Sequence, residues 1–408
     1  MPFKISKNSP LIFISLLVLL IFCWIEVDLY APAFPQLRRF FQTTEEMIQM
    51  TLSLNFLGYF TASLMVGPLG DSYGRRPVIL AGSCVFILGS LLCVLAPSLP
   101  WLLAGRLLQG LGVSAPTSLA LTVIGDLYQG DKQVKLFSLM NSLVTITMAG
   151  APILGAWLSE SFGWRANFMV ILAGSALATF GILLFLPESH PAENRLPFSL
   201  GLLGENYGAL LRSRFFLTTV FGLVFLATPY FVFIATIPFL FLETLRLPMS
   251  QYVYFQGVVV GLFALLSLMV PSLVGKVDSR KMTLGSIYLS LSASFLLCLH
   301  ALFLPDGAMA ITLLMCLFVM GTVWPCSCIF TVVFEAFPGL KGSACAMFSS
   351  IRMIVMASAI ALSGHLYNDT FKWVGVLMFI QVLTGFHLLL YAQRMGGFQV
   401  GKESLPMH

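Results

Sequence analysis

Twelve apolar segments constrain this 408-residue chain more than any other feature of its sequence. A helix that crosses a bilayer needs about 20 consecutive apolar residues. Segments of that length occur at residues 11–31, 47–67, 78–96, 101–124, 135–158, 166–187, 216–240, 251–272, 282–304, 309–333, 343–366 and 372–393. Because 58% of the residues are hydrophobic and only 10% are charged, the chain cannot build the polar surface of an ordinary soluble protein. We therefore expect an all-α membrane protein with twelve transmembrane helices.

A polar stretch divides these segments six and six. It contains Pro, Gly and charges of both signs, whereas the other links are short. A degenerate internal repeat supports the division, because aligning the two halves at an offset of about 205 residues matches Arg75 and Arg76 with Arg280 and Lys281. We expect three parts: an N-terminal six-helix bundle at 1–190, a central cytoplasmic loop at 191–214 and a C-terminal six-helix bundle at 215–408.

The distribution of basic residues predicts the orientation of the chain. If the N-terminus is cytoplasmic, fifteen of the 22 Lys and Arg residues fall in cytoplasmic segments and five in outer loops. The other two, Arg106 and Arg352, lie inside apolar segments. Basic residues accumulate on the cytoplasmic side of a membrane, so we expect both termini in the cytoplasm. The net charge of +5 then reflects topology, and no nucleic-acid partner is expected.

Motifs of other function classes are missing from the sequence. The eight cysteines fall in expected helices and form no C-x-x-C pair, so we expect neither a metal site nor a disulfide framework. The chain has no H-E-x-x-H, G-x-S-x-G or Walker lysine motif. We therefore expect no cofactor, no enzyme activity and no ATP-driven step.

The link between the second and third segments carries an unusual set of residues. Residues 67–77 contain three glycines, an acid and two arginines between two long apolar runs. Such charges cannot remain in hydrocarbon, so we predict a tight cytoplasmic turn that locks neighbouring helices together. The pattern G-x-L-x-D-x-x-G-R-R resembles the loop between helices 2 and 3 of major facilitator superfamily transporters. The resemblance implies a conformational latch made by Gly67, Asp71, Gly74, Arg75 and Arg76.

This latch needs partners at the inner ends of other helices. Asp126 ends the fourth expected helix, so we expect it to pair with Arg75 or Arg76. Asp71 is expected to cap the start of the eleventh helix near Gly342. In the family, contacts of this kind hold the outward-facing state.

Three charged residues inside the apolar segments are candidates for coupling, because charges at membrane depth tend to persist where they pair or line a cavity. Asp28 lies roughly 25 Å from the inner edge of the first helix and Arg106 roughly 27 Å along the fourth, so the two can share a layer. Glu26 stands about 200° from Asp28 on the helix, so we expect it on a different face. We predict that Asp28 faces Arg106 and exchanges the proton, with Glu26 as the alternative carrier.

Further motifs resemble one branch of the same superfamily. Residues 28–35 resemble the D-x-Y-x-P-x-x-P motif of helix 1 in Bcr/CflA drug:proton antiporters. Residues 102–112, which include Arg106, resemble the arginine-containing motif of helix 4 in the same family. Residues 150–157 match the helix 5 signature G-x-x-x-G-P-x-x-G-G only in part, with alanine at 151 and 156. This resemblance implies that a close and bent helix contact is formed by Gly150, Pro152 and Gly155.

Polar and aromatic side chains on the expected helices are candidates for the wall of a substrate cavity. In the first half they share a helical stripe with Arg106 or precede Pro152, and in the second half they are aromatic or charged. These candidates are Gln109, Asn141, Thr145, Tyr230, Trp324 and Arg352.

Taken with the resemblance, these features imply a proton-coupled antiporter that exports small organic molecules, drugs or toxic compounds, across a bacterial inner membrane by alternating access. The expected partners are the small-molecule substrate, protons and the lipid bilayer, and we expect a monomer. A dedicated metabolite or siderophore exporter or importer of the same fold is the alternative. A non-transporting membrane sensor is a further possibility, although such proteins usually carry an extra soluble domain.

Overall fold

The computed structural model describes residues 10–128, 130–195, 199–273, 276–337 and 340–395. Every regular element within these ranges is helical. Twelve of the helices, with α2 counted as the continuation of α1, are long and apolar enough to cross a membrane. The prediction of an all-α chain with twelve spanning helices is therefore confirmed for the described part of the chain.

The described chain forms two compact units. The first contains residues up to Thr44 together with Met50–Leu203, and the second contains Glu45–Gln49 together with the residues from Gly204 onward. Helices are the favoured form here because hydrocarbon offers no partner for backbone N–H and C=O groups, and a helix satisfies them internally. Hydroxyl side chains add to this pattern, as where Ser15 donates to the carbonyl of Leu11.

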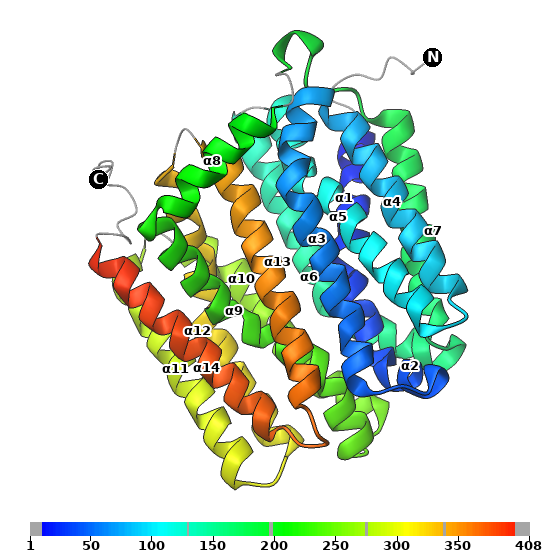
Figure 1. The fold of residues 1–408 in the computed structure, drawn as a ribbon, viewed down its shortest axis with the longest axis vertical. Coiled ribbons are helices and arrows are strands. Elements are labelled where there is room, and N and C mark those ends of the chain that lie inside the picture. The colour runs from blue at the N-terminus through cyan, green and yellow to red at the C-terminus, as the bar shows by residue number, and fades with distance from the viewer. Residues whose placement is uncertain (1–9, 129, 196–198, 274–275, 338–339, 396–408) are drawn as a thin grey trace. The chain divides into compact units, whose positions relative to one another are not determined.

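In the first unit α1 lies against α5, α6 and α7, and α4 lies against α5 and α7 (Figure 1). The buried positions of α1 are distributed around the helix, so no single face is reserved for lipid. The helices of this unit are α1 (Pro10–Tyr30), α2 (Phe34–Phe41), α3 (Glu45–Tyr73, of which Glu45–Gln49 belong to the second unit), α4 (Arg75–Leu95), α5 (Leu99–Leu127), α6 (Gly130–Phe162) and α7 (Arg165–Phe185). The short turn η1 (Ala31–Ala33) joins α1 to α2.

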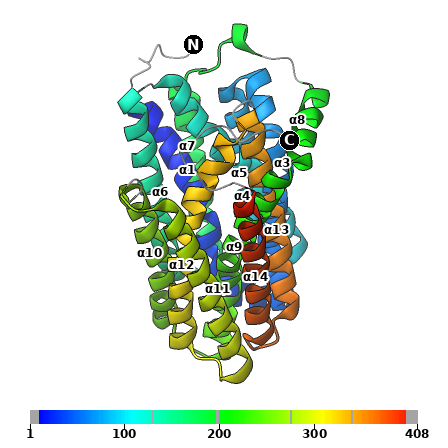
Figure 2. The same cartoon turned by 90° about the vertical axis from the view of Figure 1, so that its left-hand side faces the viewer.

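In the second unit α9 is the most buried spanning helix and packs against α12, α13 and α14. Figure 2 shows α11 between α12 and α14, and α11 packs against both. The spanning helices are α9 (Arg214–Phe239), α10 (Met249–Leu273), α11 (Ser279–Phe303), α12 (Ala308–Glu335), α13 (Lys341–Leu366) and α14 (Lys372–Arg394). The π-helical turn η3 (Leu240–Thr244) extends α9.

The segment at 191–214, which we expected to be a loop, contains a helix, α8 (Leu200–Arg212). Leu203, Tyr207 and Leu210 recur at helical spacing on its inner face, and the residues between them are mostly exposed. Burial raises the pKa of Tyr207 to about 12, so its hydroxyl stays neutral at physiological pH. Interspersed glycines conceal this helix in the sequence.

Candidate functional site

A buried ion pair joins α1 and α5 inside the first unit. Nη1 of Arg106 donates to Oε2 of Glu26 over 2.9 Å. The Arg106 side chain is 0% exposed and that of Glu26 is 2% exposed. Taking two charges out of water is costly, and their attraction repays that cost only when other polar groups satisfy the remaining atoms.

Amide and hydroxyl groups from three helices supply those contacts. Nδ2 of Asn55, on α3, donates to Oε1 of Glu26 over 3.0 Å and lies 3.3 Å from the carbonyl oxygen of Arg106. Arg106 also donates to Oε1 of Gln109 over 2.7 Å. Nε2 of Gln109 then donates to the hydroxyl of Ser90, on α4, over 2.8 Å. The polar network therefore connects α1, α3, α4 and α5.

The guanidinium of Arg106 keeps unused hydrogen-bonding capacity. Its central carbon lies 4.4 Å from the ring centre of Tyr30, in the geometry of a cation–π contact. The Tyr30 hydroxyl is 2.6 Å from that of Thr51. Nε and Nη2 of Arg106 are buried, and neither has a hydrogen-bond partner among the described residues. Arg106 can therefore accept a second partner without leaving Glu26.

The prediction that Asp28 faces Arg106 is wrong, because Glu26 is the residue that pairs with Arg106. Depth along the helix cannot decide which acid pairs with Arg106, since Glu26 and Asp28 are only two residues apart. Two residues turn an α-helix by about 200°, so only one of the two acids can point at α5. Asp28 is 5% exposed and has neither an ion pair nor a hydrogen bond to any side chain in the described part of the chain.

The contact between α1 and α6 lies next to Asp28. A Cβ atom at Gly155 would overlap the carbonyl oxygen of Leu29, so only glycine allows the two backbones to come this close. Pro152 is buried within α6. Gly150 is exposed, and a Cβ there would have nothing within 4 Å. Gly155 therefore takes part directly in the expected close helix contact, whereas Gly150 does not.

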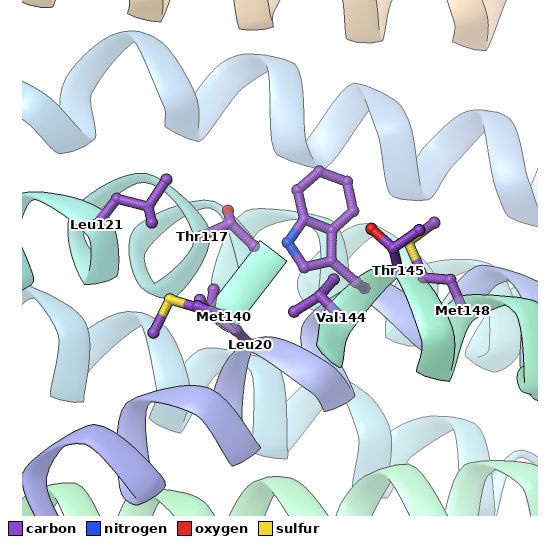
Figure 3. A pocket seen from close by; sticks show the side chains of 8 residues that line it. Leu20, Thr117, Leu121, Met140, Val144, Thr145 and Met148 are labelled. Carbon is purple, nitrogen blue, oxygen red and sulfur yellow. The ribbon is translucent and has the colours of Figure 1, made fainter. Parts of the chain in front are cut away.

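A cavity of about 220 Å³ lies between α1, α5 and α6 (Figure 3). Leu20 and Trp24 line it from α1, Thr117 and Leu121 from α5, and Met140, Val144, Thr145 and Met148 from α6. The Thr117 hydroxyl lies 3.0 Å from that of Tyr59 and donates to the Val113 carbonyl over 2.7 Å. The wall is therefore mostly apolar, with a few hydroxyl groups.

The cavity candidates of the first unit have different positions. Thr145 lines the cavity, whereas Gln109 belongs to the buried network around Arg106. The Asn141 side chain lies outside the described residues.

Candidates in the second unit occupy packed surroundings. Tyr230 stacks on Phe263 with ring centres 5.0 Å apart, and Nε1 of Trp324 donates to Thr283 over 3.2 Å. The guanidinium carbon of Arg352 lies 5.9 Å from the ring centre of Phe348, and its Nε has no hydrogen-bond partner among the described residues. Their place in a substrate cavity stays a prediction.

Charged residues at the α3–α4 turn form the cluster expected from the sequence. Nη2 of Arg75 lies 2.6 Å from Oδ1 of Asp71, and Nε of Arg75 lies 3.7 Å from Oδ2 of Asp126. The predicted pairing of Asp126 with one of the two arginines is therefore confirmed. Arg76 instead donates to the carbonyl of Leu183, on α7, over 2.7 Å. The latch role of this cluster, including Gly67 and the contact of Asp71 with the eleventh spanning helix, stays a prediction.

Sequence analysis missed one member of this cluster, Glu188. Its Oε1 accepts a hydrogen bond from the backbone N–H of Arg75 over 2.9 Å, and its Oε2 lies 3.7 Å from Arg195. Gly74 has a φ of 100°, which side chains rarely adopt, and a Cβ there would overlap the Glu188 carboxylate. Glu188 lies far from the motif in sequence, and only the requirement for Gly74 hints at a close neighbour.

Comparison with known proteins gives consistent results. A model of the Major Facilitator Superfamily matches residues 16–360. A "Bicyclomycin resistance protein homolog" from Haemophilus influenzae is 28% identical over 84% of this chain and 86% of its own length. "Multidrug resistance protein MdtL" from Escherichia fergusonii is 29% identical over 66% of this chain and 68% of its own length.

Solved structures show the same fold. The xylose transporter XylE from E. coli, in a partially occluded inward-open conformation, superposes with a TM-score of 0.73 at 14% identity, covering 97% of this chain and 100% of its own. The human organic anion transporter MFSD10 superposes with a TM-score of 0.63 at 18% identity, covering 93% and 99%.

The buried ion pair predicts a specific pattern of stability. Arg106→Met leaves Glu26 without its cation and should lower the free energy of unfolding by about 3–5 kcal/mol. Adding Glu26→Gln should recover most of that loss, because no unpaired buried charge remains. Denaturant unfolding of the purified protein in mixed lipid–detergent micelles measures both values.

Arg280 provides a matched control, because it is exposed at the start of α11. Arg280→Met should change the free energy of unfolding by no more than about 0.5 kcal/mol. An Arg106→Met variant as stable as this control would show that the ion pair does not hold the first unit together.

Proposed function

Because this chain belongs to the Major Facilitator Superfamily, we propose that it is a proton-coupled antiporter that exports small organic molecules across a bacterial inner membrane. The two curated relatives named for bicyclomycin and multidrug resistance support an export role. The chain is a multi-pass membrane protein with twelve apolar helices in its described part. Alternating access of a site near mid-membrane is the transport mode typical of this fold.

The observation that carries this proposal is the buried Glu26–Arg106 pair with its incomplete hydrogen bonding. Charges at membrane depth are costly and usually mark a pathway for protons, ions or substrate. Arg106 retains two N–H-bearing nitrogens without hydrogen-bond partners among the described residues. A purely structural arginine would be expected to use these donors, so their availability supports a role in coupling.

We assign different roles to the two acids of α1. Glu26 is the fixed partner of Arg106, since Asn55 and the guanidinium occupy both of its oxygens. Asp28 is buried without such partners, and burial of an unpaired carboxylate carries a cost that disappears when the group takes up a proton. Asp28 is therefore the proposed proton carrier.

On this assignment the coupling cycle has two half-steps. A proton that enters from the outside binds Asp28 and favours release of the substrate outward. Release of the proton to the cytoplasm then returns Asp28 to the form that accepts the next substrate. The Gly155 contact beside Leu29 places α6 where a change at Asp28 can alter helix packing.

The cavity in the first unit supports an apolar substrate with a few polar groups. Its volume of about 220 Å³ is smaller than the roughly 300–1,000 Å³ of typical drug-sized sites, so it can hold only part of such a molecule. Met140 and Met148 have flexible thioether chains that adapt to differently shaped ligands. Thr117 and Thr145 can supply hydrogen bonds.

The proton assignment predicts different behaviour for neighbouring acids. Substrate-induced proton release from purified protein, measured in weakly buffered solution with bicyclomycin or tetraphenylphosphonium, should be lost in Asp28→Asn. It should persist in Glu26→Gln, at reduced substrate affinity, because Arg106 then loses its charged partner. Glu160→Gln, an exposed acid on α6, is the matched control and should release protons like the unmodified protein.

The opposite result would reassign the carrier. If Asp28→Asn still releases protons and Glu26→Gln does not, Glu26 exchanges the proton. If neither probe induces release from the unmodified protein while both bind, coupling to protons is contradicted for these substrates.

The charged cluster at the α3–α4 turn predicts a defect in transport rather than in insertion. Asp71→Asn removes the ion pair to Arg75 and should lower the transport rate at least about tenfold, while the amount of protein in the membrane stays the same. Glu188→Ala should also slow transport, because the backbone N–H of Arg75 loses its acceptor. Efflux assays at matched expression measure both.

Asp278→Asn is the control for this experiment, because Asp278 caps α11 at the corresponding turn of the second half. It should reduce transport far less than Asp71→Asn. Near-normal rates for Asp71→Asn would remove the latch role of this cluster.

A further inference from the structure

A second cavity, of about 430 Å³, lies within the second unit between α9, α13 and α14. α9 packs against both of the other helices, while α13 and α14 have few contacts with each other. Phe225 lines the cavity from α9. Figure 1 shows α13 and α14 as neighbouring helices of this unit. The cavity is thus a groove between α13 and α14, and α9 closes one side of it.

The groove is open toward the membrane. Leu362 on α13 is 46% exposed and Ile380 on α14 is 52% exposed, and both line the cavity. Exposed apolar side chains of a spanning helix are well suited to contact with lipid tails. A molecule dissolved in the bilayer can therefore enter the groove from the side.

One buried polar group in the groove has no partner. Gln381 is 6% exposed, yet its Oε1 has no hydrogen-bond partner among the described residues. It is the tenth of the 23 residues of α14, so it lies about 14 Å along the helix, near the middle of the hydrocarbon layer. An amide carbonyl at this depth has no water to bond, which makes the missing donor costly.

The other polar groups of the groove also present acceptors. The Ser358 hydroxyl donates to the carbonyl of Ile354 over 2.8 Å, and the Thr384 hydroxyl donates to the carbonyl of Ile380 over 2.8 Å. Because their hydrogens are used within the helices, these hydroxyls offer only oxygen lone pairs to a ligand. No charged side chain is among the described residues that line the groove.

We propose that this groove binds a small amphipathic molecule from the membrane, with an apolar ring system and an uncharged O–H or N–H donor that bonds to Gln381. The apolar lining contacts the ring system, and the acceptor oxygens of Gln381, Ser358 and Thr384 favour a ligand that carries a hydrogen-bond donor. A phospholipid acyl chain has no donor for the Gln381 carbonyl, so it would leave this buried acceptor unsatisfied. The site goes beyond the proposed antiport function, because binding here requires neither Arg106 nor a proton gradient.

A matched pair of probes tests this selectivity. 1-Naphthol carries an O–H donor, and 1-methoxynaphthalene has the same ring system without it. Binding of each to the full-length protein in lipid nanodiscs is measured by equilibrium dialysis, with empty nanodiscs subtracted. The unmodified protein should bind 1-naphthol about fivefold more tightly, the value of one ordinary hydrogen bond.

Three variants locate the binding site. Gln381→Leu should abolish the preference for 1-naphthol while leaving binding of 1-methoxynaphthalene nearly unchanged. Leu362→Trp should block binding of both probes, because the indole fills the groove. Leu313 is an exposed leucine on α12, so Leu313→Trp is the control and should bind both probes like the unmodified protein.

Two outcomes would overturn the proposal. If Gln381→Leu keeps the full preference for 1-naphthol, Gln381 is not the acceptor. If Val144→Trp, which fills the cavity of the first unit, removes binding while Leu362→Trp does not, the probes bind in the first unit and the groove is not their site.

Discussion

The attraction between Glu26 and Arg106 is the interaction on which the first unit depends. An arginine at this depth has no water to solvate it, so its charge requires a carboxylate, and the carboxylate requires donors of its own. Asn55, on α3, donates to the carboxylate, while Gln109, on α5, accepts from Arg106 and donates in turn to Ser90, on α4. One ion pair therefore fixes the mutual rotation of several helices that apolar packing alone would leave poorly specified.

Fixing that rotation separates the two acids of α1. Glu26 points at Arg106, and Asp28 lies on another side, next to the point where Gly155 brings α6 against Leu29. The proposed mechanism uses this division, since one acid maintains the buried cation while the other changes its protonation state. Part of the Arg106 guanidinium has no hydrogen-bond partner in the described chain, so Arg106 retains donors beyond those that Glu26 and Gln109 use.

Sequence alone predicts the twelve spans, because a run of about 20 apolar residues leaves few alternatives in a membrane. It also predicts that Asp126 pairs with Arg75 or Arg76, because these charges lie at helix ends on one side of the membrane, and the structure shows that Arg75 is the partner. It fails to identify the partner of Arg106. α1 is apolar around most of its circumference, so its sequence does not reveal which acid faces α5.

Other features escape sequence analysis for related reasons. Glu188 reaches the α3–α4 turn from a polar segment more than a hundred residues away, and no local pattern marks such a contact. The glycines of α8 weaken its helical signal, although Leu203, Tyr207 and Leu210 keep the correct spacing. Gln381 looks like an ordinary polar residue until the structure shows that its carbonyl lacks a donor.

The central claim is that Asp28 carries the proton while Glu26 stays bound to Arg106. Infrared difference spectroscopy of the purified protein in lipid tests it directly, because a protonated carboxyl group has a C=O stretching band that a carboxylate lacks. Our account predicts that adding substrate removes such a band, that Glu26→Gln retains this change and that Asp28→Asn abolishes it. A band that persists in Asp28→Asn and disappears in Glu26→Gln would contradict the account.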